Sequence, residues 1–145
     1  MTKDGLVAEA RSWIGTPYLH QASMKGAGCD CLGLLRGVWR TYLGAEPEAL
    51  PPYTPDWDEI SKTDVLRCAA EAHLVEKSPA AMAAGDVILF RMKRRAVAKH
   101  LGICTDVGAE PMFIHSYAGH GVVENSLSEP WKKRIAGVFS FPGSS

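Results

Sequence analysis

A cysteine and two histidines carry the chemistry that this sequence suggests. Cys31 stands where an amphipathic helix should begin, and the unpaired N–H groups of a helix N-terminus favour a thiolate. The same N–H groups could stabilise the oxyanion formed when the sulfur attacks a carbonyl carbon. Because most free cysteines are small buried residues, the position of Cys31 alone indicates packing rather than catalysis.

His100 and His115 lie on two consecutive predicted strands, with a turn around Gly108 between them. Folding this hairpin places residues near 100 opposite residues near 115, and side chains that pair directly share one face of a sheet. One histidine could then hold the ring of the other by an Nδ1 hydrogen bond, as the orienting group does in a triad. A poised cysteine with a base and an orienting group fits nucleophilic acyl transfer. The alternative, two half-buried strand histidines without a catalytic role, stays open on these residues alone.

Two helices are predicted in the first third of the chain. Apolar residues at helical spacing predict one from about Asp4 to Ile14, with Asp4 as its cap and Gly15 at its end. The second runs from Cys31 to Leu43, with Asp30 as N-cap and Gly44 just past its end.

Two glycines and three further segments complete the first half. Gly33 and Gly37 lie one turn apart in the second helix, which indicates that something packs unusually close to that face. Residues 18–28 are predicted to form a loop. Residues 45–61, which hold four prolines, are predicted to be an extended connection, and a third helix should follow at about Asp64 to Val75.

The second half changes to the pattern of short strands separated by turn residues. Helices followed by antiparallel strands predict an α+β fold, and the length of 145 residues predicts a single domain over residues 1–145. The predicted strands are Val87–Phe90, His100–Thr105, Met112–Tyr117, Val122–Ser126 and Ile135–Phe141.

Charge and hydropathy exclude some classes of partner. Sixteen basic residues balance sixteen acidic residues, so the net charge favours neither nucleic acid nor an anionic membrane. No apolar run approaches the roughly 20 residues that a membrane helix needs, so we expect no membrane insertion. The first residues, Met1 to Gly5, lack the apolar core of a secretory signal, and we therefore expect synthesis in the cytoplasm.

Five segments resemble motifs of the NlpC/P60 cysteine peptidases and follow one another in the same order. Any one match alone would be weak, but together they cover nearly the whole chain. The matching segments are Gly15-Thr-Pro-Tyr18, Asp30-Cys-Leu-Gly-Leu34, Gly85-Asp-Val-Ile-Leu-Phe90, His100-Leu-Gly-Ile103 and Phe113-Ile-His115.

The resemblance implies a papain-like core, with the nucleophile helix packed on an antiparallel sheet of about five strands. It makes Cys31 the nucleophile, His100 the base and His115 the orienting residue. Should His115 not orient the base, Asn125 or His120 would be the next residue to test.

The resemblance also implies which residues line the substrate site. Tyr18, His20 and Asp30 are the candidates for substrate binding and for the oxyanion site, although Tyr18 could equally be a packing residue. Leu32 replaces the usual serine after the nucleophile, and Leu19-His20-Gln21 replaces a common glycine pair. These departures affect the substrate more than the type of reaction.

The implied activity is that of a peptidoglycan endopeptidase without cofactor or metal, which cleaves stem peptides, commonly between D-glutamate and a diamino acid. The likeness is strongest to peptidases of phage tails and gene transfer agents. We therefore expect association with a virion or tail and action on the wall in the periplasm.

Three alternatives remain open. A structural tail-assembly protein would keep the fold, and an amidase or acyltransferase would keep the thioester. A zinc site of His20, Cys29, Cys31 and His100 is the third, but C-x-C is a poor match to the usual ligand spacing.

Overall fold

The computed structural model describes residues 2–47, 65–91 and 98–144. The predicted connection at 45–61 and the start of the third helix at Asp64 thus lie largely outside the described residues. The helices are α1 (Lys3–Arg11), α2 (Cys31–Leu43), α3 (Val65–His73), the 3₁₀ turn η1 (Pro79–Ala81) and α4 (Glu129–Lys132). The strands are β1 (Ser23–Met24), β2 (Gly28–Cys29), β3 (Val75–Lys77), β4 (Val87–Arg91), β5 (Ala98–Asp106), β6 (Met112–Tyr117), β7 (Gly121–Ser126) and β8 (Ile135–Ser140).

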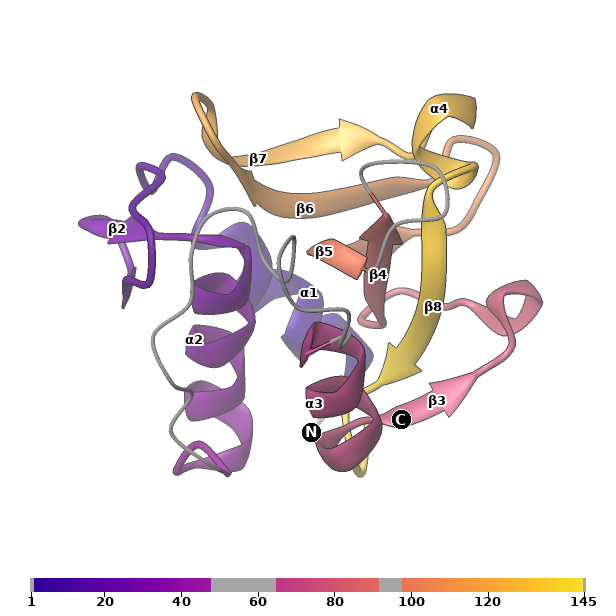
Figure 1. Cartoon of the computed structure of the whole chain (residues 1–145), viewed down its shortest axis with the longest axis horizontal. Coiled ribbons are helices and arrows are strands. Elements are labelled where there is room, and N and C mark those ends of the chain that lie inside the picture. The colour runs from indigo at the N-terminus through magenta and orange to yellow at the C-terminus, as the bar shows by residue number, and fades with distance from the viewer. Residues whose placement is uncertain (1, 48–64, 92–97, 145) are drawn as a thin grey trace.

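Six strands form one antiparallel sheet in the order β3-β8-β4-β5-β6-β7 (Figure 1). The five strands predicted from the sequence are all present. The sheet has six strands where about five were expected, because the segment Val75–Lys77 after α3 forms an additional edge strand, β3. The predicted loop at 18–28 contains a second sheet, the short hairpin of β1 and β2.

Helix α1 begins one residue earlier than predicted and is capped by Thr2. The Thr2 hydroxyl accepts a hydrogen bond from the Gly5 N–H at 3.0 Å, so the expected Asp4 cap was wrong. Asp4 lies inside the first turn, where its negative charge interacts favourably with the positive end of the helix dipole. The helix ends at Arg11, and residues 12–15 continue as turns.

Helices α1, α2 and α3 contribute to one core cluster with the side of the sheet that they cover (Figure 1). A smaller apolar cluster lies on the other side of the sheet, where α4 packs. Its buried members are Ile88, Phe90, Cys104, Phe113 and Leu127, and Trp131 packs against them. Among the described residues no helix is both long and apolar enough to cross a membrane.

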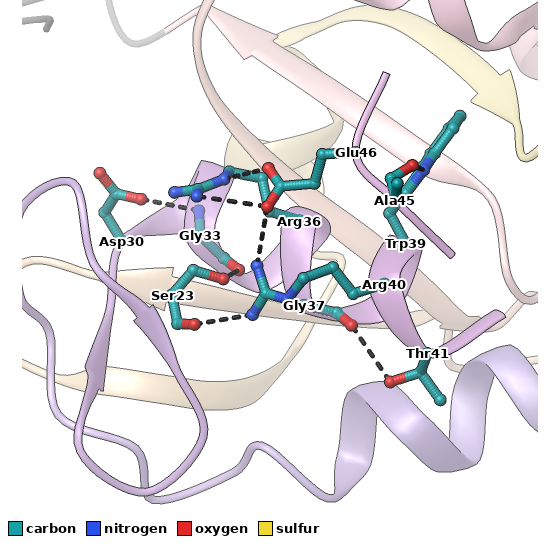
Figure 2. Close-up of polar contacts among 10 residues, drawn as sticks. All are labelled: Ser23, Asp30, Gly33, Arg36, Gly37, Trp39, Arg40, Thr41, Ala45 and Glu46. Carbon is teal, nitrogen blue, oxygen red and sulfur yellow. Dashed lines mark hydrogen bonds and ion pairs between the residues drawn. The ribbon is translucent and has the colours of Figure 1, made fainter. Parts of the chain in front are cut away.

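Helix α2 is fixed to the β1–β2 hairpin by bonds from its first turn and from Arg40 (Figure 2). Asp30 is its N-cap, as predicted, and accepts a hydrogen bond from the Gly33 N–H at 2.7 Å. The Ser23 hydroxyl donates to the Gly33 carbonyl at 2.6 Å, and Arg40 donates to the Ser23 carbonyl at 2.7 Å. These bonds hold α2 against the hairpin.

Gly33 and Gly37 do allow an unusually close approach, as their spacing predicted. A Cβ on Gly33 would lie 1.8 Å from the carbonyl oxygen of Ala22, and one on Gly37 would lie 2.0 Å from Cζ2 of Trp13. The hairpin backbone and the Trp13 ring therefore pack directly on the α2 backbone.

Candidate active site

The start of α2 contacts two strands at the point where their pairing ends. The β5–β6 ladder ends at the Ile103–Ile114 pair, although β5 begins at Ala98 and β6 continues to Tyr117. Residues 29–31 contact both strands beyond this last pair, through the backbone of Leu101 on β5 and the side chain of Ser116 on β6.

Two hydrogen bonds, each with one backbone partner, hold residues 29–31 against these strands. On the β6 side, the Ser116 hydroxyl donates to the Cys29 carbonyl at 2.7 Å. On the β5 side, the Leu101 N–H donates to the sulfur of Cys31, which also accepts from the Leu32 N–H. The thiol therefore lies against the residue that follows His100.

The Cys31 thiol is protonated at rest. Only 6% of Cys31 is exposed, and burial, followed by the charge of Asp30, raises its pKa from 9.0 to about 12. The hydrogen bonds from Leu101 and Leu32 act in the opposite direction but are outweighed. The lowering of the thiol pKa expected at the helix N-terminus is therefore outweighed, because the cost of burying the charge is larger.

The two histidines and Asn125 form a hydrogen-bonded chain across β5, β6 and β7. Nε2 of His100 lies 2.7 Å from Nδ1 of His115, and Nε2 of His115 lies 2.7 Å from Oδ1 of Asn125. The expected histidine–histidine contact is present, but it engages Nε2 of His100. Because Nε2 is occupied, Nδ1 is the ring nitrogen of His100 that remains for the thiol. Asn125 does not replace His115 but lies behind it.

The histidines are diagonal neighbours rather than the direct pair that was expected. Continuing the register of the Ile103–Ile114 pair places Gly102 opposite His115. A Cβ on Gly102 would lie 3.4 Å from Cβ of His115 and 2.8 Å from Cδ2 of Phe113. The missing side chain of Gly102 thus leaves room for the His115 ring to reach His100 diagonally.

Burial keeps both histidines neutral. Burial, with a smaller effect of His115, lowers the pKa of His100 from 6.5 to about 3. Burial also lowers the pKa of His115; the hydrogen bond to Asn125 opposes this shift, and the charge of His120 adds to it. The resting site therefore holds neutral imidazoles and a neutral thiol.

Sequence reasoning missed Trp131 on α4. Its ring centroid lies 5.1 Å from that of His115, 5.9 Å from that of His100 and 5.2 Å from that of Phe90. The rings meet edge to face at His115, and the indole covers the histidine pair from the side opposite α2. No local pattern links residue 131 to residues 100 and 115, because only the return of the chain after β7 brings them together.

The segment that carries Tyr18 is fixed by backbone bonds. Val122 N–H donates to the Thr16 carbonyl at 2.9 Å, Cys29 N–H donates to the Pro17 carbonyl at 3.0 Å, and the Thr16 hydroxyl accepts from Gly26 N–H at 2.9 Å. The pKa of the half-buried Tyr18 is raised by burial and then by the charges of Cys31 and Asp30, which places the phenol near the thiol.

Asp30 and His20 lie together beside the start of α2. Asp30 is 2% exposed, and its second carboxylate oxygen accepts from the Gln21 N–H at 2.7 Å. Nδ1 of His20 lies 3.8 Å from the same oxygen. The structure thus gives Asp30 an N-cap and loop-holding position, while substrate contact by Tyr18, His20 and Asp30 stays a prediction. Within the described ranges, no three His, Cys, Asp or Glu side chains are grouped so that they could hold a metal ion.

The sequence matches a known protein family over most of its length. The sequence model of the NlpC/P60 family matches residues 15–140, and this chain belongs to that family. The expected resemblance is therefore confirmed at the level of the family.

Two curated relatives of this chain have names that state different activities. The murein DD-endopeptidase MepS/murein LD-carboxypeptidase of Escherichia coli strain K12 is 29% identical over 133 residues, 91% of this chain and 59% of the relative. The gamma-DL-glutamyl hydrolase of Bacillus subtilis strain 168 is 30% identical over 139 residues, 94% of this chain and 29% of the relative. The chain thus spans less than two-thirds of either protein.

Solved structures show the same fold. The NlpC/p60 domain of the peptidoglycan hydrolase SagA matches with a TM-score of 0.69 and 22% identity, covering 97% of this chain and 100% of that domain. An NlpC/P60 family protein from Bacillus cereus ATCC 10987 matches with a TM-score of 0.67 and 20% identity, over 96% of this chain and 40% of that one. The α+β, papain-like fold class predicted from the sequence is confirmed.

Proposed function

We propose that this chain is a peptidoglycan hydrolase, a cysteine endopeptidase that cleaves wall stem peptides through a thioester on Cys31. The observation that carries the proposal is the position of the thiol. The sulfur of Cys31 accepts a hydrogen bond from the N–H of Leu101, the residue after His100. Nε2 of His100 is hydrogen-bonded to the buried His115. The family and the names of the two relatives support the reaction class.

In the proposed mechanism, proton transfer accompanies attack. Nδ1 of His100 takes the proton of the Cys31 thiol while the sulfur bonds to the scissile carbonyl carbon, whose oxygen becomes an oxyanion. The Cys31 N–H has no hydrogen-bond acceptor among the described residues, and in this mechanism it stabilises the oxyanion, with Tyr18 or His20 as a side-chain donor. The C–N bond then breaks, and His100 returns the proton to the leaving amine. Water hydrolyses the thioester and regenerates the thiol.

The bond that we propose is the one between D-glutamate and the diamino acid of the stem peptide. The name of the Bacillus subtilis relative supports a glutamyl linkage. The name of the Escherichia coli relative, a DD-endopeptidase, supports a different bond, between two residues of D configuration. That bond is the second candidate.

We also propose that residues 1–145 act as one peptidase domain, made in the cytoplasm and carried by a phage-like tail to the wall in the periplasm. The sequence resemblance to tail peptidases supports the delivery route. Mass spectrometry of purified particles tests it: the chain should co-purify at a fixed ratio to tail proteins, and its absence from the particles would refute this route.

The first experiment is digestion of diaminopimelate-type peptidoglycan, with mass analysis of the released peptides. The wild type should release fragments whose masses name the bond, and Cys31→Ala should release none. Cys68→Ala is the matched control, because Cys68 is an exposed cysteine on α3 and should be dispensable.

The outcomes separate the alternatives. Release of amide-cleaved or acyl-exchanged products would favour the amidase or acyltransferase. Release by Cys31→Ala as well as by the wild type would refute the nucleophile. A folded wild type that releases nothing, with Cys31 unreactive towards a thiol probe, would favour the structural protein.

A further inference from the structure

The hydrogen-bonded chain of His100, His115 and Asn125 has a direction. A neutral imidazole has one N–H donor and one acceptor nitrogen. A ring that donates to one neighbour must therefore accept from the other. Nε2 of His115 faces Oδ1 of Asn125 at 2.7 Å, and a carbonyl oxygen can only accept. His115 must therefore carry its proton on Nε2 and accept through Nδ1.

The same logic continues to the base. Because Nδ1 of His115 accepts, Nε2 of His100 must carry a proton and donate across the 2.7 Å contact. Nδ1 of His100 then holds a lone pair. If the amide of Asn125 were turned so that its NH₂ group faced His115, both bonds would reverse, and Nδ1 of His100 would carry a proton and could not accept one from the thiol.

The two rings are enclosed, and the amide lies at the surface. His115 is fully buried and His100 is 7% exposed, whereas Asn125 is exposed to solvent. Two other rings lie near the histidine pair. The Tyr117 ring stacks on His115 with centroids 5.3 Å apart, and the His120 ring stacks on Tyr117 with centroids 5.4 Å apart. Among the described residues, neither ring has a hydrogen bond to Nε2 of His115. Asn125 lies opposite Phe113 in the β6–β7 register, which places it on the face and at the diagonal where it meets His115.

We propose that Asn125 is a positioning residue that sets the tautomer of His100 through His115, and so makes Nδ1 of His100 the base for the Cys31 thiol. The inference rests on the proposed cysteine-hydrolase function for its purpose. Its test uses two measurements that need no peptidoglycan.

The variants differ in what residue 125 can do. Asn125→Asp keeps the shape and can only accept, so it locks the productive direction. Asn125→Leu keeps much of the volume and removes the acceptor. Ser126→Ala is the control, because Ser126 is the next residue on β7 and pairs with Met112 on the opposite face of the strand.

The first measurement is the ¹⁵N chemical shift of the imidazole nitrogens at pH 8. Wild type, Asn125→Asp and Ser126→Ala should show the proton on Nε2 in both His100 and His115. Asn125→Leu should show His100 with the proton partly on Nδ1. A wild-type His100 protonated on Nδ1, or unchanged tautomers in a folded Asn125→Leu protein, would overturn the proposal.

The second measurement is the rate of Cys31 alkylation by iodoacetamide against pH, in a Cys68→Ser background that removes the exposed thiol. Asn125→Leu should slow alkylation by about tenfold or more, because an orienting group that fixes the wrong tautomer disables the base. Asn125→Asp should keep the rate and move its acidic limb to higher pH, since a carboxylate stabilises the imidazolium.

The charged and titratable groups near the pair stay constant across this series: Cys31 on α2, Tyr117 on β6, His120 in the β6–β7 turn and Arg134 over the Trp131 ring. Equal alkylation profiles for Asn125→Leu and Ser126→Ala would refute the role of Asn125. That result would leave peptidoglycan cleavage by Cys31 untouched, while a wrong substrate would leave these two readouts intact.

Discussion

The resting thiol and imidazole are both neutral, so in the proposed mechanism His100 acts as a general base rather than as a standing counter-ion. Burial raises the pKa of Cys31 to about 12 and lowers that of His100 to about 3. Charge separation is therefore unfavourable until an electrophilic carbonyl receives the electrons of the sulfur. Attack and proton transfer are expected to be concerted, and the bound substrate is what makes the nucleophile strong.

Gly102 gives the sharpest residue-scale prediction. Gly102→Ala would put a Cβ 2.8 Å from the Phe113 ring and 3.0 Å from the Ile114 carbonyl oxygen, next to the His115 backbone. His115 should be displaced, and kcat should fall by about 10²-fold or more while KM changes little, because the base is misplaced and not the substrate.

Gly108→Ala is the matched control for that variant. Gly108 lies in the β5–β6 turn, and its Cβ would meet only a side-chain oxygen of Asp106 at 3.1 Å. Kinetics of both variants on released stem peptides would decide the point. Equal kcat values for the two would show that the space at Gly102 does not matter.

At the scale of elements, α2 depends on its two glycines. Glycine-to-alanine changes in an exposed helix stabilise by about 1 kcal/mol, but Gly37→Ala would place a Cβ 2.0 Å from the Trp13 ring. Overpacking of this kind costs about 1–3 kcal/mol, so we expect the free energy of unfolding to fall in urea titrations. Gly37→Ala should be partly rescued when Trp13 is also changed to Leu, and an unrescued loss would contradict the Trp13 contact as its cause.

Helix α4 should matter through Trp131 alone. Trp131→Leu would open the histidine pair to water, and the pKa values of both histidines should rise towards 6.5. The acidic limb of the Cys31 alkylation profile should then move to higher pH. Trp39→Leu removes an equally large ring beside Phe141, far along α2, and should leave the profile in place.

The elements with a long periodic pattern were predictable from the sequence, and the short ones were not. Helix α2 matched its predicted limits at Asp30 and Gly44, and β4 to β8 matched theirs within two residues. Strands β1 and β2 have two residues each and β3 has three, which is too few for a period to appear.

The sequence predicted the placement of site residues that depends on local structure. It did not predict contacts that depend on the register between strands. Cys31 could be placed because a helix start is visible in sequence. The diagonal contact of His100 with His115, the space at Gly102 and the cover by Trp131 depend on a strand register and on a chain return that no local pattern encodes.

The molecule as a whole should have a stability plateau between about pH 6.5 and pH 9. His100 has a folded-state pKa of about 3 against 6.5 when unfolded. Between about pH 3 and pH 6.5 the unfolded state therefore binds more protons than the folded state. Stability is then full above pH 6.5 and is lost as the pH falls towards 3. Cys31 has a raised folded-state pKa, so its contribution is full below pH 9 and is lost as the pH rises towards 12.

Thermal unfolding of matched variants from pH 4.5 to 10 checks this plateau. His100→Phe should flatten the acidic fall in Tm, and Cys31→Ala should reduce the alkaline fall, where buried Cys29 and Cys104 also contribute. Glu9 and Glu46, whose pKa values are also lowered, add to the acidic fall only below about pH 4.5. An acidic fall of equal steepness in His100→Phe would contradict the histidine as its source.

The four cysteines differ in how they would meet an oxidant. Peroxides attack thiolates that they can reach, and the sulfur of Cys31 is both protonated and enclosed, as are those of Cys29 and Cys104. Cys68 alone is exposed, on α3 and outside the site. Oxidative damage should therefore begin at Cys68, and a preparation kept in air can carry a sulfenic or sulfinic acid there while its nucleophile remains a thiol.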